Sequence, residues 1–151
     1  MNLFLRLIIA LLFTFPLAGC IGEEYDFTPP TVSLSNTNDI QIEDLKEANI
    51  DWRGENNKRY EKETKDVLAL AKKQAQMYFI PGQKVDLQFD SEDFAIEELV
   101  ITLWHNNKKI DLKLNDDRSF YFPKEKGAYV IEVNLDTDRG RAQYIGQVVI
   151  Q

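Results

Sequence analysis

The stretch Tyr129-Val130-Ile131-Glu132-Val133-Asn134-Leu135 decides the fold, because large apolar side chains recur in it at every second position. This period of two is typical of a β-strand that turns one face to a core. Turn residues fill the segment 136–140, and another strand is predicted from Ala142 to Ile150. The C-terminal end of the chain is therefore expected to be β-structure.

The same period extends back to residue 83. Turn residues such as Asn106-Asn107 separate four further predicted strands, at 85–89, 99–104, 110–114 and 120–122. Together with the two C-terminal strands, they predict an antiparallel β-sandwich over residues 83–151.

Three motifs in this region resemble an immunoglobulin-like domain of the bacterial cell-surface type. They are Gly127-Ala128-Tyr129-Val130-Ile131-Glu132-Val133, Asp138-Arg139-Gly140 and Ala142-Gln143-Tyr144. In such domains this stretch forms the last two strands and their hairpin, with a tyrosine near the start of the penultimate strand. The resemblance covers about half the chain, which lacks the cysteine pair of antibody domains. It implies an adhesive, spacer or docking module and provides no catalytic residues.

Residues 31–82 are expected to form an N-terminal extension of this domain. Alternation in Thr31-Val32-Ser33-Leu34-Ser35 predicts an edge strand, and a short strand is predicted at 48–52. An amphipathic helix is predicted near 57–79, capped by Asn56 or Asn57 and ended by Pro81-Gly82. Either packing on the sandwich or docking of a partner would explain its apolar stripe, which comprises Tyr60, Thr64, Val67, Leu68, Ala71, Ala75 and Tyr78.

The first twenty residues resemble the signal of a bacterial lipoprotein. Arg6 precedes an apolar run from Leu7 to Phe15, and Leu17-Ala18-Gly19-Cys20 has the order of a lipobox. The resemblance implies that residues 1–19 are removed, that Cys20 carries acyl chains, and that residues 20–30 form a tether. The protein would then be anchored on the extracytoplasmic face of the cell membrane. The alternatives are an ordinary signal peptide in which Cys20 is incidental, or a buried core helix over residues 1–19.

The charge and the cysteine count narrow the classes of partner. The chain has 18 basic and 25 acidic residues, and removal of the signal would take away one more cation, Arg6. This balance argues against binding to nucleic acid or to an anionic lipid surface, both of which need basic patches. The only cysteine is Cys20, so the domain must be stabilised by its core and not by a disulfide.

The sequence offers few residues for catalysis. His105 is the only histidine, and no Gly-x-Ser-x-Gly elbow or glycine-rich phosphate loop is present. One histidine and one cysteine cannot form a zinc cluster. The protein is therefore expected to be a non-enzymatic binding or accessory module for a protein or cell-envelope ligand. Such a module should expose aromatic side chains, for which Tyr121, Tyr144 and Trp104 are candidates.

Acidic residues gather in particular loops. Because successive antiparallel strands reverse direction, the loops 90–98, 115–118 and 136–141 are expected at one end of the sandwich. The turns 105–109 and 123–127, which are rich in lysine, are expected at the other. The acidic end is either a solvated rim, a surface for a basic partner, or a calcium site. A calcium site would make the protein a cation or small-ligand sensor, with Asp90, Glu92, Asp93, Asp136 and Asp138 as the candidate ligands.

Overall fold

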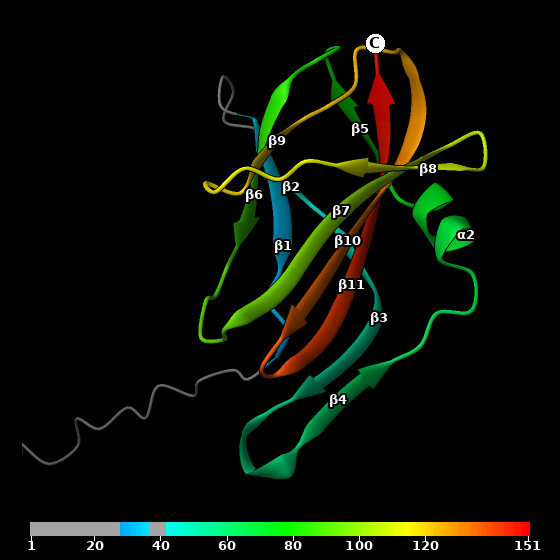
Figure 1. Cartoon of the computed structure of the whole chain (residues 1–151). Helices are drawn as coiled ribbons and strands as arrows, with labels where there is room; N and C mark the ends of the chain where they lie inside the picture. Colours follow the sequence, from blue (N-terminus) through cyan, green and yellow to red (C-terminus); the bar gives the residue numbers. More distant parts are fainter. Residues whose placement is uncertain (1–27, 37–41) are drawn as a thin grey trace, which may run out of the picture.

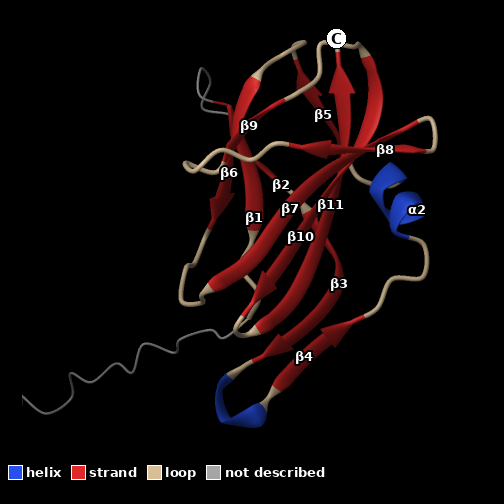
Figure 2. Ribbon diagram, in the orientation of Figure 1, coloured by secondary structure: helices blue, strands red, loops and turns tan. Residues whose placement is uncertain are grey.

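The computed structural model describes residues 28–36 and 42–151. These residues form a mainly β structure with antiparallel sheets, one short α-helix, α2 (Val67–Lys72), and a 3-10 turn, Glu55–Asn57 (Figure 2). The predicted signal and most of the predicted tether, including Cys20, lie outside the described residues. All the strands of the described residues belong to two sheets.

The smaller sheet has four antiparallel strands in the order β2-β1-β6-β9. They are β2 (Ile42–Asp44), β1 (Val32–Asn36), β6 (Lys84–Phe89) and β9 (Ser119–Tyr121). The strand predicted at 31–35 is therefore confirmed, but its predicted edge position is wrong. β1 lies between β2 and β6 because the short β2 covers its outer side.

The larger sheet is built around the hairpin of β10 (Gly127–Thr137) and β11 (Gly140–Ile150) (Figure 1). β7 (Ile96–His105) and then β8 (Lys108–Leu112) continue the sheet from β10. β3 (Lys46–Arg53) pairs with the first half of β11, and β4 (Arg59–Lys62) pairs with β3. β5 (Gln76–Phe79) pairs in parallel with the last four residues of the same edge of β11.

The two sheets pack face to face around one hydrophobic core. Tyr129, Ile131, Val133 and Leu135 of β10 point inward, as their spacing predicts, and are almost fully buried. They pack in one cluster with residues of the smaller sheet, among them Val32, Leu34, Val85, Leu87 and Phe120. This burial of apolar surface is the main stabilising contribution to the fold.

All six strands predicted from residue 83 onward are present, with small shifts at their ends. The turn at Asn106-Asn107 is also confirmed. Both asparagines have positive φ angles, 49° and 60°, and His105 pairs directly with Lys108. Such a two-residue turn matches the twist of the flanking strands, and asparagine tolerates its left-handed backbone.

The predicted helix at 57–79 is wrong in extent. The helix α2 covers only Val67–Lys72, and Asp66, not Asn56 or Asn57, caps it by accepting a hydrogen bond from Ala69 N at 2.9 Å. Asn56 lies instead in a single 3-10 turn, Glu55–Asn57. The flanking residues form β4 and β5 because β3 and β11 offer them open sheet edges, and this pairing overrides the local helical period.

Residues 31–82 are also not a separate extension. They supply β1 and β2 to the smaller sheet and β3, β4 and β5 to the larger one. Trp52, on β3, is 2 % exposed and belongs to the same core as Ile131. Strands from both halves of the described chain, 32–36 and 42–151, therefore contribute to the main core.

We expect Gly140→Ala to lower the free energy of unfolding by about 2 kcal/mol or more. Gly140 has a φ of 139°, and an added Cβ would lie 2.1 Å from the carbonyl oxygen of Asp51 on β3. Chemical denaturation would measure the loss. Gly54→Ala is a matched control, because Gly54 has a φ of −87° that any residue adopts. Equal stability of the two variants would contradict the close approach of β3 to this hairpin.

Candidate functional site

The described chain begins at one end of the two sheets, and its first residues are fastened to the core. Tyr144, which is fully buried, donates a hydrogen bond from its hydroxyl to Pro30 O at 2.6 Å. Burial raises the pKa of the Tyr144 hydroxyl, so it remains a donor. Thr31 N donates to Asp90 Oδ1 at 2.7 Å, and Asp90 N donates back to Thr31 O. The point of entry of the chain is therefore held by three hydrogen bonds.

Two of the three acidic loops meet at this end, as predicted. Ala95 N donates to Asp138 Oδ1 at 2.8 Å, and Asp138 N donates to Ala95 O, so the loop before β7 is bonded to the β10–β11 turn. The loop 115–118 is placed differently from the prediction. It runs along β6, where Arg118 O accepts from Leu87 N and Asp117 pairs with Lys84 at 3.2 Å.

The five candidate calcium ligands are held by other partners or lie apart. Asp90 and Asp138 accept backbone N–H groups, Asp136 pairs with Arg141, and Glu92 pairs with Arg118. Over residues 28–36 and 42–151, no group of three or more carboxylate, histidine or cysteine side chains lies close enough to hold a metal ion. The proposed ligands, Asp93 among them, therefore do not form a shared site in this part of the chain.

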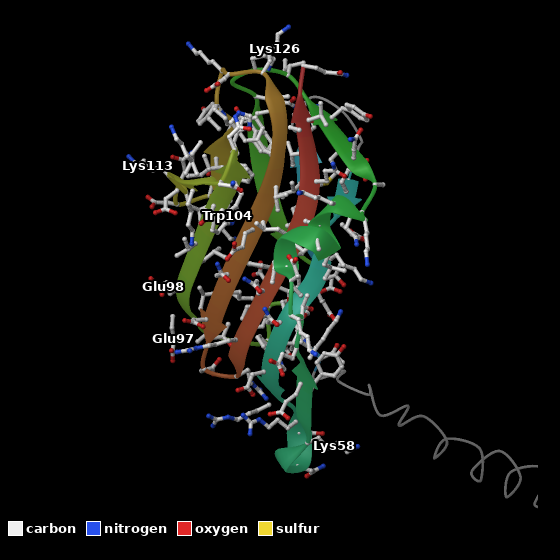
Figure 3. The ribbon with its side chains drawn as sticks, turned by 90° about the vertical axis from the view of Figure 1, so that its right-hand side faces the viewer. Lys58, Glu97, Glu98, Trp104, Lys113 and Lys126 are labelled. Atoms are coloured by element: carbon white, nitrogen blue, oxygen red, sulfur yellow. The ribbon has the colours of Figure 1, made fainter. Side chains whose placement is uncertain are left out.

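Charge is also less polarised along the molecule than the loops predicted. Figure 3 shows Glu97 and Glu98 near the β10–β11 turn and Lys126 at the opposite end. The end with the turn nevertheless also has an open hollow whose lining includes both acids and arginines. Arg59 forms two hydrogen bonds with Asp51 there, at 2.9 and 2.8 Å, and these lower the pKa of Asp51. The acidic end is therefore a surface of mixed charge.

A second open hollow lies on the outer face of the larger sheet, between α2 and the turn from β7 to β8. We call it the Trp104 hollow. Its volume is about 360 Å³, and its lining includes Leu68, Lys72, Trp104, His105, Asn106 and Gln147. Figure 3 shows Trp104 beside α2 on this face. Polar side chains around an apolar floor are the usual composition of a small-molecule site.

His105 is fixed at the rim of this hollow. Its ring stacks on Tyr129, with ring centroids 4.4 Å apart, and its Nδ1 lies 2.9 Å from Ala128 O. Its Nε2 lies 2.9 Å from Asn106 Nδ2. An N–H at Nδ1 and an acceptor at Nε2 satisfy both contacts, so this neutral tautomer fits the site. A Cβ on Gly127 would lie 2.9 Å from the His105 ring, which explains the glycine at that position.

A buried carboxylate lies beside the hollow. Glu132 on β10 is 8 % exposed and accepts hydrogen bonds from Trp104 Nε1 at 2.6 Å, Asn134 Nδ2 at 2.8 Å and Gln143 Nε2 at 3.0 Å. Burial raises the pKa of Glu132, but the three donors together lower it more, so its pKa is lowered overall. Glu132 is therefore ionised at neutral pH and orients the Trp104 ring.

The same polar network reaches the segment before α2. Gln143 Oε1 accepts a hydrogen bond from Asn49 Nδ2 at 2.5 Å, and Asn49 Oδ1 accepts one from Thr64 N at 2.7 Å. Asn49 lies where the register between β3 and β11 shifts, and such a bulge redirects side chains. Ala71 of α2 packs on Ile145 of β11. The network and this contact together fix one wall of the Trp104 hollow.

The three aromatic candidates have different positions. Tyr144 belongs to the core, Trp104 is half-buried in the hollow, and Tyr121 is 57 % exposed on β9. The sequence analysis missed Glu132, Gln143 and Asn49. Their only sequence signal is a polar residue at an outward strand position, which usually faces solvent.

Comparisons with known proteins do not add a relative: no family model, no curated protein and no solved structure matches the chain. In the part of the chain that the structure describes, no helix has the length and apolar character needed to cross a membrane.

We expect Glu132→Gln to lower the free energy of unfolding at neutral pH by about 1–3 kcal/mol, because the new amide must direct its N–H groups at one of the existing donors. Wild-type Glu132 stabilises the fold above its ordinary pKa of 4.5, and this contribution is lost as the pH falls through the lowered pKa of the folded state. The difference between the two proteins should therefore shrink below pH 4.5. Denaturation at several pH values would measure it.

Glu98→Gln is the control for that experiment, because Glu98 is exposed on β7 of the same sheet. A difference that persists unchanged in acid would mean that Glu132 is not the ionised acceptor described above.

We expect Tyr144→Phe to destabilise the domain by about 1–3 kcal/mol, since Pro30 O would lose its buried donor. Hydrogen exchange at the amide of Thr31 should speed up, because the entry segment is held partly through Tyr144. Tyr121→Phe alters an exposed hydroxyl and is the control. Unchanged exchange at Thr31 would show that the Tyr144 bond does not hold the entry segment.

Proposed function

We propose that this chain is a lipid-anchored, extracytoplasmic lipoprotein that acts as a non-enzymatic binding module. The observation that carries the proposal is the run Leu17-Ala18-Gly19-Cys20 after a short apolar segment with one early cation. An acyl chain contributes about 0.8 kcal/mol per buried methylene, and two or more chains give stable anchoring without a basic patch. The acidic composition of the chain is compatible with this mode of attachment.

We further propose that the two sheets form an immunoglobulin-like sandwich. In support, the order β11-β10-β7-β8 faces the order β1-β6-β9, as strands G, F, C and C′ face A, B and E in that fold. Tyr129 near the start of β10 donates a hydrogen bond to Glu125 O at 2.9 Å, four residues upstream. A tyrosine bonded to the backbone at this corner is a hallmark of the class.

The position of chain entry supports an orientation for this module. Only residues 21–28 separate Cys20 from the buried Pro29 and Pro30, a reach of about 30 Å at most. The entry lies beside the β10–β11 turn, and the C-terminus lies at the far end of the sheets (Figure 1). The turn would therefore face the membrane. The Trp104 hollow is lined from the turn between β7 and β8 and the start of β10, both distant from that end.

Cys20 is the residue to test, because the proposed anchoring depends on its acylation alone. We expect the full chain, expressed in bacteria with an alkyne analogue of palmitate, to be labelled and to remain in the membrane fraction after a high-salt wash. Cys20→Ala should lose both the label and the membrane retention, because no thiol is left to acylate. Gly22→Ala keeps the cysteine and is the matched control.

Labelling of Cys20→Ala equal to that of the wild-type chain would overturn the lipoprotein proposal. Membrane retention of a wild-type chain that carries no label would also overturn it, because the anchor would then not be a lipid.

A further inference from the structure

We infer that the Trp104 hollow binds an acidic glycan, that is, sugar rings that carry carboxylate groups. The inference deepens the proposed function and rests on it, because an extracytoplasmic module meets the polysaccharides of the cell envelope. It is carried by the juxtaposition of an indole ring, side-chain amides and Lys72 around a hollow of about 360 Å³, with Lys109 over the same indole ring. That volume lies within the range of small-molecule sites and far exceeds that of a single ion.

The walls of the hollow suit the two kinds of surface that a sugar ring presents. Leu68, Trp104 and Val130 supply apolar surface for the C–H face of a ring. The amides of Asn106, Asn107 and Gln147 both donate and accept hydrogen bonds, as sugar hydroxyl groups do. Since Glu132 and Tyr129 hold Trp104 and His105 in place, the site is organised before a ligand arrives.

The charges around the hollow favour an anion. Lys72 lines it from α2, and Lys109 on β8 places its Nζ 5.5 Å from the centroid of the Trp104 ring. No carboxylate belongs to the lining itself. The nearby Glu132 is 8 % exposed, and its charge is held by three hydrogen-bond donors and by Lys109, so Lys72 is the charge in the lining that a ligand meets. A cationic ligand would meet Lys72 unfavourably, and an acidic one would be attracted by it.

An extended peptide fits this surface less well. β7 is paired on both sides, with β10 and β8, and β10 is paired with β7 and β11. The backbone under the hollow is therefore already hydrogen-bonded, and it cannot accept an added strand. Recognition must come from side chains, which suits a compact, hydroxyl-rich ring.

The test is calorimetric titration of the full lipidated chain in detergent micelles. The probes are tetragalacturonate, its neutral methyl ester and free galacturonate. We expect tetragalacturonate to bind most tightly, with an affinity that falls as ionic strength rises. Its binding should also change the fluorescence emission of Trp104. The other tryptophan, Trp52, is 2 % exposed in the core and should not respond.

Two variants and one control assign the binding to this hollow. Lys72→Met and Lys109→Met should each weaken the binding of tetragalacturonate about two- to fivefold, the usual worth of an exposed charge pair. Lys113→Met removes an exposed lysine just beyond β8, outside the hollow, and should leave the affinity unchanged. All three changes are at exposed side chains, so the fold should tolerate them.

Several results would overturn the inference. If tetragalacturonate and its methyl ester bound with equal affinity, the lysines would have no role in recognition. If galacturonate and tetragalacturonate bound with equal affinity, the hollow would be a site for an anion and not for a glycan. No binding, or equal weakening by all three lysine variants, would also exclude this site. Labelling and retention through Cys20 are measured separately. If Cys20 is labelled and the chain is retained but no glycan binds, only this inference is rejected. If labelling and retention fail, the lipoprotein proposal is rejected.

Discussion

The hydrogen-bonded ladder between β10 and β11 is the constraint on which the rest of the structure depends. It runs without interruption through eleven residue pairs, from Gly127 opposite Ile150 to Thr137 opposite Gly140. The outer edge of β10 receives β7, and the outer edge of β11 receives both β3 and β5. One face of this ladder supplies the core and the other the polar network of Glu132. Because β3 and β5 share one edge of β11, the chain must leave the sheet between β4 and β5, and there it forms the helix α2. The position of α2, and with it one wall of the Trp104 hollow, therefore follows from strand pairing.

The sequence predicted those parts of the fold in which local pattern and long-range pairing agree. From β6 onward, alternation such as Tyr129, Ile131, Val133 and Leu135 identified each strand, because one face of each is buried. Between residues 57 and 79 the two disagree. Tyr60, Val67 and Tyr78 have helical spacing, yet Tyr60 and Tyr78 are exposed on strands and only the central six residues form a helix. A strand of four residues is too short for its alternation to be recognised, and the sheet edge that it joins can belong to a distant part of the chain.

The candidate site shows the same division. Cys20 could be proposed from the sequence because the run that resembles a lipobox is contiguous. The Trp104 hollow could not, because Lys72, Trp104, Ala128 and Gln147 come together only through four different elements. The acidic loops illustrate the reverse error. Strand alternation correctly brought the loops at 90–98 and 136–141 to one end, but it did not reveal that Arg118, Arg141 and backbone N–H groups occupy the carboxylates.

The fastening of Pro30 and Thr31 also has a mechanical consequence. β1 starts at this end and runs antiparallel to β6, so a pull on the N-terminal side acts along the strand axis. The five register pairs with β6 and the three with β2 would then be loaded together in shear, and not opened one after another. The Tyr144 bond would bear the load first, before it reached the ladder. A fold without a disulfide would thereby resist a force applied to its N-terminal side, because the course of β1 sets the direction in which that force acts.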